Sequence, residues 1–340
     1  MARGCAPGRG SRDPARRLQG SACATPRAGD RPVAGARPDL TETPPVTLLA
    51  PGLPDAPHPP RRQPRAEGAV RVAVEASGQG QGERPGAALR VRGPSSRLAD
   101  LYQSGSARCL LPQGEPAATA VLINTAGGIT GGDRFAWHAR TGAGAELVLA
   151  TQTAERAYRA QPGEVGRVDV TLELSPGARL DWLAQETILF DGSALERCLR
   201  VEMAEDAHLL VVEPVVLGRA AMGEQVTQAH FADRWEIRRG GRLIRAEATR
   251  LSGPVAEIAA RPAVLAGQRA FATILYAAPD AERKLSMARE FLPKNCAGAS
   301  YLRETLSIRL AAPDGAHLRS ALRHLLAGLR DRPLPRVWTM

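Results

Sequence analysis

Three short segments, Gly144-Ala145-Glu146-Leu147, Gly177-Ala178-Arg179-Leu180 and Asp206-Ala207-His208-Leu209, each begin an apolar run, and they follow one another at spacings of 33 and 29 residues. Each run leads into a polar cluster: Thr151-Gln152-Thr153, Gln185-Glu186-Thr187 and Glu213. Strand units that stack on one another through a recurrent turn would produce this pattern. A chance repetition of Gly-Ala pairs in an alanine-rich chain is the competing interpretation.

The chain around these segments, from about Val70 onward, consists of short apolar or alternating runs separated by Gly, Pro, Asn and Asp. This texture is typical of many short strands. We expect strands in the ranges 70–74, 119–123, 146–150, 168–174, 209–212 and 235–244. The sequence therefore predicts a mostly β fold: a single large body of many short strands, arranged as a stacked β-sheet or a solenoid, with a few C-terminal helices.

Helical spacing is clear only near the C-terminus. The spacing of leucines there predicts an amphipathic helix through Leu318, Leu322, Leu325, Leu326 and Leu329. A second helix is predicted to run from Asp280, as its N-cap, and to end at Pro293. Leucine stripes of this kind usually pack on a protein core, so we expect both helices to cover an edge or face of the sheet.

Residues 1–66 differ from the rest because they hold 13 of the 27 prolines and sustain no apolar periodicity. Such a segment cannot bury enough apolar surface to offset the entropy of ordering it. We expect 1–66 to be a disordered extension rich in Arg, Pro and Ala, or a start assigned too far upstream, and 67–340 to form the β-rich domain. The N-terminus lacks the apolar core of a secretory signal, which indicates the cytoplasm.

The net charge of +10 arises from 45 Lys and Arg against 35 Asp and Glu, and only Lys284 and Lys294 are lysines. A GC-rich coding sequence explains such an arginine bias. Residues 1–66 carry 11 Arg and 5 acids, which leaves a net charge of +4 for the other 274 residues. Since that part shows no aligned basic face, we expect no nucleic-acid partner. Nucleic-acid binding driven by the Arg-rich residues 1–66 stays an alternative.

No apolar run in the sequence approaches the roughly 20 residues of a membrane span.

Five scattered cysteines form no C-x-x-C pair, and the six histidines supply no third ligand beside His317 and His324. We therefore expect neither a disulfide framework nor an enclosed metal centre. The residues also form no nucleophile elbow or H-E-x-x-H motif, so a catalytic function is not indicated.

A glycine-rich loop, Gly127-Gly128-Ile129-Thr130-Gly131-Gly132, follows the predicted strand 119–123, which is a context in which phosphate-binding loops occur. It lacks the Lys-Ser/Thr pair of a P-loop, and Asp133 would repel phosphate. A tight turn that requires positive φ angles is the favoured interpretation. A phosphate- or nucleotide-binding enzyme that uses this loop remains the alternative function.

Several carboxylates interrupt otherwise apolar strand sequence, among them Glu186, Asp191, Glu213 and Glu224. Buried acids cost several kcal/mol unless they are paired or hydrogen-bonded. They either pair structurally with Arg156, Arg159 or Arg219, or they line a polar interior path and act as transient oxygen ligands of a divalent ion.

Six segments, in this order, resemble the UreD (UreH) family of urease accessory proteins. They are Asn124 to Asp133, Thr151 to Arg159, Trp182 to Gly192, Leu217 to Glu224, Asp233-Arg234-Trp235, and Leu334-Pro335-Arg336-Val337-Trp338. The resemblance covers about residues 70–340. One mild departure is Thr151-Gln152-Thr153-Ala154-Glu155-Arg156, where the family commonly has Thr-Gln-Ala-Ala-Glu-Lys.

The resemblance implies a non-enzymatic scaffold in urease maturation, with a mostly β fold. It implies binding to apo-urease and to the accessory protein UreF, which docks the GTPase UreG. Nickel would be in transit through an internal path, with no tightly bound cofactor. On this basis we expect the path to be lined or shaped by Asp133, Glu186, Asp191, Glu213 and Glu224, with Glu247 a weaker addition and Arg219 holding one of the acids. The C-terminal helical region and 335–338 are the expected docking surface.

Overall fold

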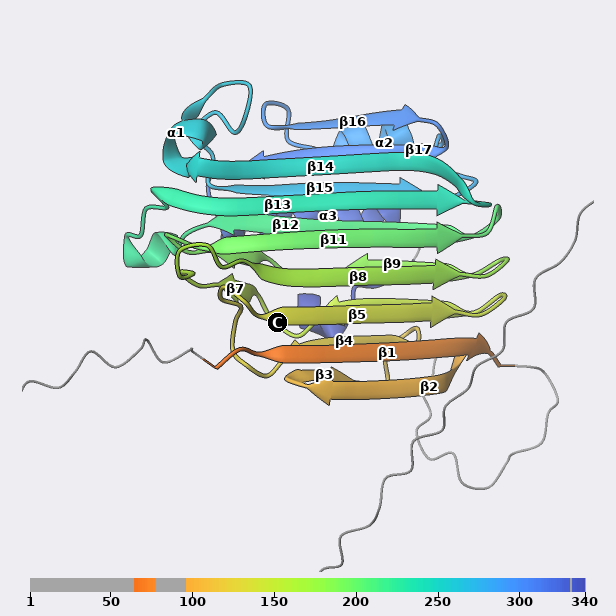
Figure 1. Ribbon diagram of the computed structural model, residues 1–340. Helices are drawn as coiled ribbons and strands as arrows, with labels where there is room; N and C mark the ends of the chain where they lie inside the picture. The colour runs from red at the N-terminus through yellow and green to blue at the C-terminus, as the bar shows by residue number, and fades with distance from the viewer. Residues whose placement is uncertain (1–63, 78–95, 331, 340) are drawn as a thin grey trace, which may run out of the picture. The chain divides into compact units, whose positions relative to one another are not determined.

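The computed structural model describes residues 64–77, 96–330 and 332–339. The described residues form two β-sheets, and Figure 1 looks onto the first of them. In order across that sheet lie β14 (Arg242–Pro254), β13 (Gln228–Arg239), β11 (Ala194–Met203), β8 (Gly166–Leu174), β5 (Arg134–Thr141), β1 (Glu67–Ala76) and β2 (Ser96–Gly105). The predicted extension 1–66 lies almost wholly outside the described residues, so that assignment stays a prediction.

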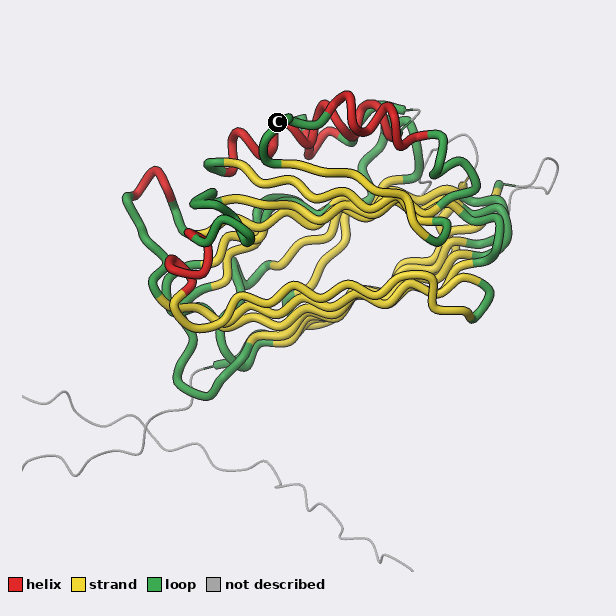
Figure 2. The backbone as a smooth tube through the Cα atoms, turned by 90° about the horizontal axis from the view of Figure 1, so that it is seen from above, coloured by secondary structure: helices red, strands yellow, loops and turns green. Residues whose placement is uncertain are grey.

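The second sheet lies behind the first. Its order is β16 (Ala297–Leu302), β17 (Thr305–Ala312), β15 (Ala270–Ala277), β12 (His208–Leu217), β9 (Arg179–Leu183), β6 (Glu146–Thr151), β4 (Thr119–Asn124) and β3 (Ala107–Leu110). Two short strands lie off this path, since β10 (Thr187–Leu189) pairs with β12 and β7 (Glu155–Ala157) pairs with β10. Figure 2 shows the two sheets edge-on as separate layers.

The central chain alternates between the sheets, so that two successive strands make one coil of a stack. Strands β5, β8, β11 and β13 run parallel in the first sheet, and β4, β6, β9 and β12 run parallel in the second. Because each strand returns to its own sheet one coil later, its neighbours come from the coils on either side. The predicted mostly β, solenoid-like fold is confirmed.

The three segments that suggested a repeat form stacked turns at one end of the coils. In the second sheet, Arg179 pairs in register with both Glu146 and His208. The backbone N–H of Gly144 donates to the Pro176 carbonyl at 2.9 Å, and the Gly177 N–H donates to Asp206 Oδ1 at 2.9 Å. Gly144 and Gly177 have φ angles of 64° and 66°, which favour glycine. The Gly-Ala repetition is therefore structural, and Asp206 replaces the third glycine with a side-chain acceptor.

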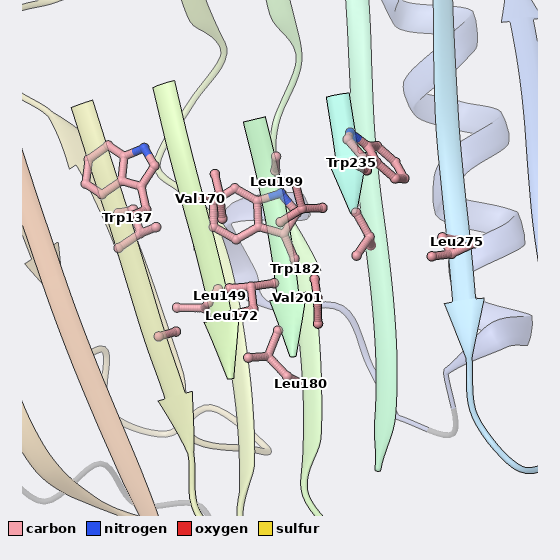
Figure 3. Close-up of a cluster of buried hydrophobic side chains, with 14 of the residues drawn as sticks. Trp137, Leu149, Val170, Leu172, Leu180, Trp182, Leu199, Val201, Trp235 and Leu275 are labelled. Carbon is pink, nitrogen blue, oxygen red and sulfur yellow. The ribbon is translucent and has the colours of Figure 1, made fainter. Parts of the chain in front are cut away.

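The core fills the space between the sheets, because alternate side chains of every coil point inward. Figure 3 shows this cluster, in which Trp137, Trp182 and Trp235 lie among aliphatic side chains. Leu180 and Leu149 belong to it and are at most 1% exposed. Full burial of each such side chain contributes about 1.5–3 kcal/mol.

The outer face of the second sheet is covered by helices, as Figure 2 shows. Helix α3 (Gly315–Leu329) buries the predicted leucines against residues such as Val212 and Ile308. Strand β12 is consequently buried on both faces, which explains its nearly continuous apolar sequence. The remaining helical segments are α1 (Val255–Ala260), α2 (Lys284–Phe291) and the 3-10 turns η1 (Ala220–Met222) and η2 (Arg336–Trp338). None of the helices in the described ranges is long and apolar enough to cross a membrane.

Two local predictions were wrong. Helix α2 begins at Lys284 with Arg283 at the N-cap position, whereas Asp280 accepts a hydrogen bond from the Tyr276 hydroxyl at 2.7 Å. The expected strand 235–244 is a hairpin, since β13 ends at Arg239 and β14 begins at Arg242. The Gly240-Gly241 pair between them is a strong turn signal that the apolar pattern concealed.

Candidate functional site

A cavity of about 100 Å³ lies between the two sheets. Its inner wall includes Trp182, Glu213, Arg197 and Asp233. Its lining also includes exposed residues on β7 and in the loops around it: Gly127, Gln152, Thr153 and Arg156. The cavity therefore leads from the surface beside these loops to a buried charged cluster.

The buried cluster is centred on Arg197, whose guanidinium bridges two carboxylates. Its Nη1 donates to Glu213 Oε2 at 2.6 Å, and its Nη2 donates to Asp233 Oδ2 at 2.6 Å. Nη1 also lies 3.0 Å from Thr187 Oγ1. The Trp182 indole N–H donates to Glu213 Oε1 at 2.7 Å, so both oxygens of this carboxylate are held. The Arg197 and Glu213 side chains are only 8% and 6% exposed.

Strand alternation places these residues opposite one another. In β11 the inward positions are Leu195, Arg197, Leu199, Val201 and Met203, so Arg197 replaces one apolar side chain of an inward series. Asp233 takes the corresponding place in β13, where it is the direct register neighbour of Arg197. Glu213 comes from β12 in the facing sheet. Consecutive strands of the stack thus contribute one charge each to a single point of the core.

Burial and the close opposite charges act against each other on the pKa values of this cluster. It raises the pKa of Glu213, although the Arg197 charge and hydrogen bonds to Trp182 and Arg197 oppose the rise. Burial disfavours the Arg197 charge, but the adjacent Asp233 and Glu213 carboxylates outweigh it and raise the pKa of Arg197. With both acids ionised, one guanidinium faces two carboxylates and the cluster carries a net charge of −1. Its composition therefore favours a further cation or proton.

Glu155 provides a third carboxylate on the cavity lining, near the mouth. Burial raises its pKa, against the effect of hydrogen bonds from Asn124 and the Arg156 backbone. Asn124 Nδ2 donates to Glu155 Oε2 at 3.2 Å. The side chain is thus neutralised more easily than an exposed glutamate, and it is fixed beside the loops that surround the entrance.

The loops at the mouth stack on one another although they are far apart in sequence. The Ile129 N–H donates to the Arg156 carbonyl at 2.7 Å, and the Phe190 N–H donates to the Ala157 carbonyl at 3.0 Å. The Gly218 N–H continues the stack with a bond of 2.8 Å to the Leu189 carbonyl. Four of the six segments that carry the family resemblance therefore meet at one end of the coils.

The glycine-rich loop is a structural turn within this stack. Gly127 and Gly132 have φ angles of 80° and 86°. The Ile129 amide donates to the Arg156 carbonyl, and the Gly132 amide donates to the Val165 carbonyl. The Thr130 amide donates to Asp133 Oδ2. These donors are thus satisfied inside the protein and do not form the free amide cradle that a phosphate site requires.

Of the five predicted path residues, Glu213 alone lines this cavity. Asp133 is buried in the turn, where its carboxylate accepts from the Ala66 and Thr130 amides at 2.8 Å.

Glu186 pairs with Arg319 of α3 at 2.8 Å. The weaker candidate Glu247 pairs with Arg245 and Arg309. Asp133, Glu186 and Glu247 are thus hydrogen-bonded or paired away from the cavity lining, and a contribution of these acids to a nickel path stays a prediction.

Asp191 and Glu224 lie together outside the cavity. The Asp191 amide donates to Glu224 Oε1 at 3.2 Å, and Arg219 Nε donates to Glu224 Oε2 at 2.8 Å. Arg219 therefore does hold one of the predicted acids. Asp191 Oδ2 accepts from Arg159 at 2.5 Å. Both acids have the arginine partners that the structural alternative anticipated, and together they join the mouth loops to one another.

The sequence did not single out Arg197, Thr187 or Glu155 as site residues. A signal for Arg197 was present, because an arginine at an inward position of an alternating strand requires a buried counter-charge. Within the described ranges, no three His, Cys, Asp or Glu side chains are grouped so as to hold a metal ion. The site is accordingly a mixed cluster of acids, arginine and hydroxyl.

The expected C-terminal docking surface is partly wrong. Trp338 is fully buried, and its indole N–H donates to the Leu183 carbonyl at 3.0 Å. It closes the core beneath α3 and is not available to a partner. The leucines of α3 are likewise buried against the second sheet.

Comparisons with known proteins find similarity over most of the chain. A family model described as UreD urease accessory protein matches residues 85–339. The urease accessory protein UreD of Ruegeria pomeroyi is 50% identical over 253 residues, which are 74% of this chain and 98% of that protein. The protein of the same name from Rhizobium leguminosarum bv. viciae is 49% identical over 72% of this chain and 90% of its own. The protein of the same name from Methylobacterium sp. (strain 4-46) is 47% identical over 82% of this chain and 96% of its own length.

Proposed function

Because the chain belongs to the UreD family of urease accessory proteins, we propose that it is a non-catalytic scaffold that binds apo-urease and supports nickel insertion into the urease active site. In this proposal it acts in the cytoplasm, and nickel is cargo in transit, with no cofactor resident in the chain. The partners are apo-urease, UreF and, through UreF, the GTPase UreG.

The cavity with the Arg197 cluster is the observation that carries the proposal. It combines a lining that includes exposed loop residues with carboxylates from Glu213, Asp233 and Glu155. A path for an ion must attract the ion and then release it. Oxygen ligands that are already engaged with an arginine meet this requirement better than a closed Cys and His cage does.

The stacked loops at the cavity mouth are the surface that we assign to partner binding. They hold the exposed side chains of Tyr158 and Met222, which are 38% and 73% exposed. The Arg219 guanidinium lies 4.3 Å from the centre of the Phe190 ring, and the Tyr158 ring meets Phe190 edge-on at 5.0 Å. Aromatic and arginine side chains of this kind are enriched at protein interfaces.

The test of the proposal separates nickel insertion from complex assembly. We expect Glu213→Gln to lower the nickel content of urease roughly tenfold when the chain is co-expressed with urease and its accessory proteins, by analogy with the loss of a ligand-supporting group. Glutamine keeps an acceptor for the Trp182 indole, so the fold should persist. Nickel is measured by mass spectrometry, and assembly by affinity capture with urease.

Glu196→Gln is the matched control, because Glu196 lies on the outer side of β11, 3.5 Å from Arg167. It should leave both nickel content and assembly at the wild-type level. Full nickel insertion by Glu213→Gln would rule out the path through this cluster. Saturable micromolar nucleotide binding by the chain would instead favour the enzyme alternative.

A further inference from the structure

We propose that Arg197 is a built-in competitor of the cargo: its guanidinium occupies the place between Glu213 and Asp233 that a divalent cation takes during transit. This inference rests on the proposed function, because it specifies how the site binds its ion weakly. The arginine is displaced when the cation arrives and returns when the cation leaves.

The oxygen atoms around Arg197 suit a divalent cation. Two carboxylates, each 2.6 Å from a separate guanidinium nitrogen, converge from two sheets on one position. The Thr187 hydroxyl adds a third oxygen at 3.0 Å from Nη1. Carboxylate and hydroxyl oxygens bind divalent metal ions. The Trp182 indole N–H also holds the other oxygen of Glu213, so this carboxylate stays in place when the arginine moves.

Arg197 is held less completely than its two short ion pairs suggest. Its Nε is buried, and no acceptor for it is found among the described residues. Unpaired buried donors cost about 1–3 kcal/mol. The cavity beside it offers about 100 Å³, and the Phe231 ring lies 5.1 Å from the guanidinium carbon. A displaced guanidinium therefore has space in the cavity, and its displacement would cost the cation–π contact that it makes with Phe231 in its present position.

The charges explain why a permanent competitor is useful. Two ionised carboxylates without an arginine would exactly neutralise a divalent cation in a buried site, and such a site would trap the ion. An arginine cannot give up its proton in a protein, so it competes with the cation at every physiological pH. The cation gains the carboxylates only while Arg197 is displaced, and the return of Arg197 favours release.

The inference predicts a gain of nickel binding when the arginine is removed. In the full-length chain, purified alone or with its accessory partners, Arg197→Met should bind one additional Ni²⁺ with an affinity roughly tenfold or more above wild type. Equilibrium dialysis against nickel chloride measures this directly. Arg197→Met combined with Glu213→Gln should lose the added site. Arg200→Met, on the outward side of the same strand beside Asp169, should bind nickel as wild type does.

Arg197→Lys keeps the experiment decisive if the methionine variant does not fold. A lysine ammonium lacks the fork that spans two carboxylates, so nickel affinity should lie between those of wild type and the methionine variant. No gain in either folded variant overturns the inference. If Glu213→Gln blocks insertion while neither arginine variant gains nickel, only this inference fails. If Glu213→Gln has no effect on insertion, the proposed nickel path through this cluster fails, and this inference fails with it.

Discussion

Asp191 accepts three hydrogen bonds on one carboxylate oxygen, from the Thr227 amide, the Thr227 hydroxyl and the Gln228 amide. These bonds, led by that from Gln228, lower the pKa of Asp191 to about 2 from its ordinary value of 3.8. A carboxyl whose pKa is lowered by folding stabilises the protein above its unfolded pKa. The contribution of Asp191 should therefore be complete above pH 3.8 and disappear as the pH falls towards 2.

Asp191→Asn tests this assignment. The variant should lose about 1 kcal/mol of unfolding free energy at pH 7, because one charge-assisted acceptor is weakened. The difference from wild type should shrink below pH 4, as measured by urea unfolding between pH 7 and pH 3. Asp169→Asn, at an exposed ion pair with Arg200, should change the stability by less than about 0.5 kcal/mol. A pH-independent difference for Asp191→Asn would contradict the assignment.

The glycines of the mouth loop differ in the space around them. A Cβ atom at Gly128 would lie 2.2 Å from Cε2 of Tyr158 and 2.8 Å from the Arg156 carbonyl, whereas Gly127 has nothing within 4 Å. Both positions have a positive φ angle, 157° at Gly128 and 80° at Gly127, so alanine is strained at either position. Gly128→Ala adds overpacking and should cost about 2–3 kcal/mol, against about 1–2 kcal/mol for Gly127→Ala. Thermal unfolding measures both. Equal losses would show that packing under Tyr158 is unimportant.

The candidate site was predictable in part. Glu213 was found because an acid interrupts an apolar run, which is visible along one strand. The contacts of Glu213 could not be predicted, because Arg197 and Asp233 reach it from other strands. The register that joins these strands depends on stacking over whole coils. In a chain with 43 arginines, a single inward arginine also carries little signal by its identity alone.

Helix α3 was predicted well because five leucines repeat with helical spacing over its length. The start of helix α2 was placed three residues early, because Asp280 is a stronger N-cap signal in the sequence than Arg283, the residue at the true N-cap position. The short helix α1 was not predicted. Its six residues are fewer than two turns, so no apolar periodicity can develop.

The contribution of α3 to the core can be measured with a neighbouring pair of residues. Leu322→Ala should lower the unfolding free energy by about 2–5 kcal/mol, because Leu322 is fully buried against the second sheet. Arg323→Ala, one position along and exposed, should change it by less than about 0.5 kcal/mol. Denaturant unfolding of both variants provides the comparison. A small loss for Leu322→Ala would mean that α3 is not part of the cooperative unit.

For the whole chain, the stacked-strand architecture was predictable because the turn sequence repeats and the two-residue alternation persists. The division of the strands between two sheets could not be predicted, since apolar and polar residues alternate in the same way whichever sheet a strand joins. The order of the antiparallel strands β15, β17 and β16 also had no counterpart in the sequence pattern, because no turn repeat marks this part of the chain.

Residues 1–63 should be dispensable for urease maturation. The family match begins at residue 85, and the first described strand begins at Glu67. A chain that starts at residue 64 keeps the bond from the Ala66 amide to Asp133. Its melting temperature, and the nickel content of urease co-expressed with it, should match those obtained with the full chain. Lost insertion with unchanged melting would assign a partner-binding role to the deleted segment.

The two ends of the coils place different limits on how the chain can diverge. At one end the turns at Gly144, Gly177 and Asp206 are bonded to one another, so an added residue would also disturb the turns above and below it. At the other end the loops are also hydrogen-bonded to one another, but their connections are longer and differ from coil to coil, from the glycine-rich loop to the segment around Met222, so they have more room for an added residue. Insertions and deletions acquired over evolution should therefore collect beside the cavity mouth, where they can alter partner choice without shifting the strand register.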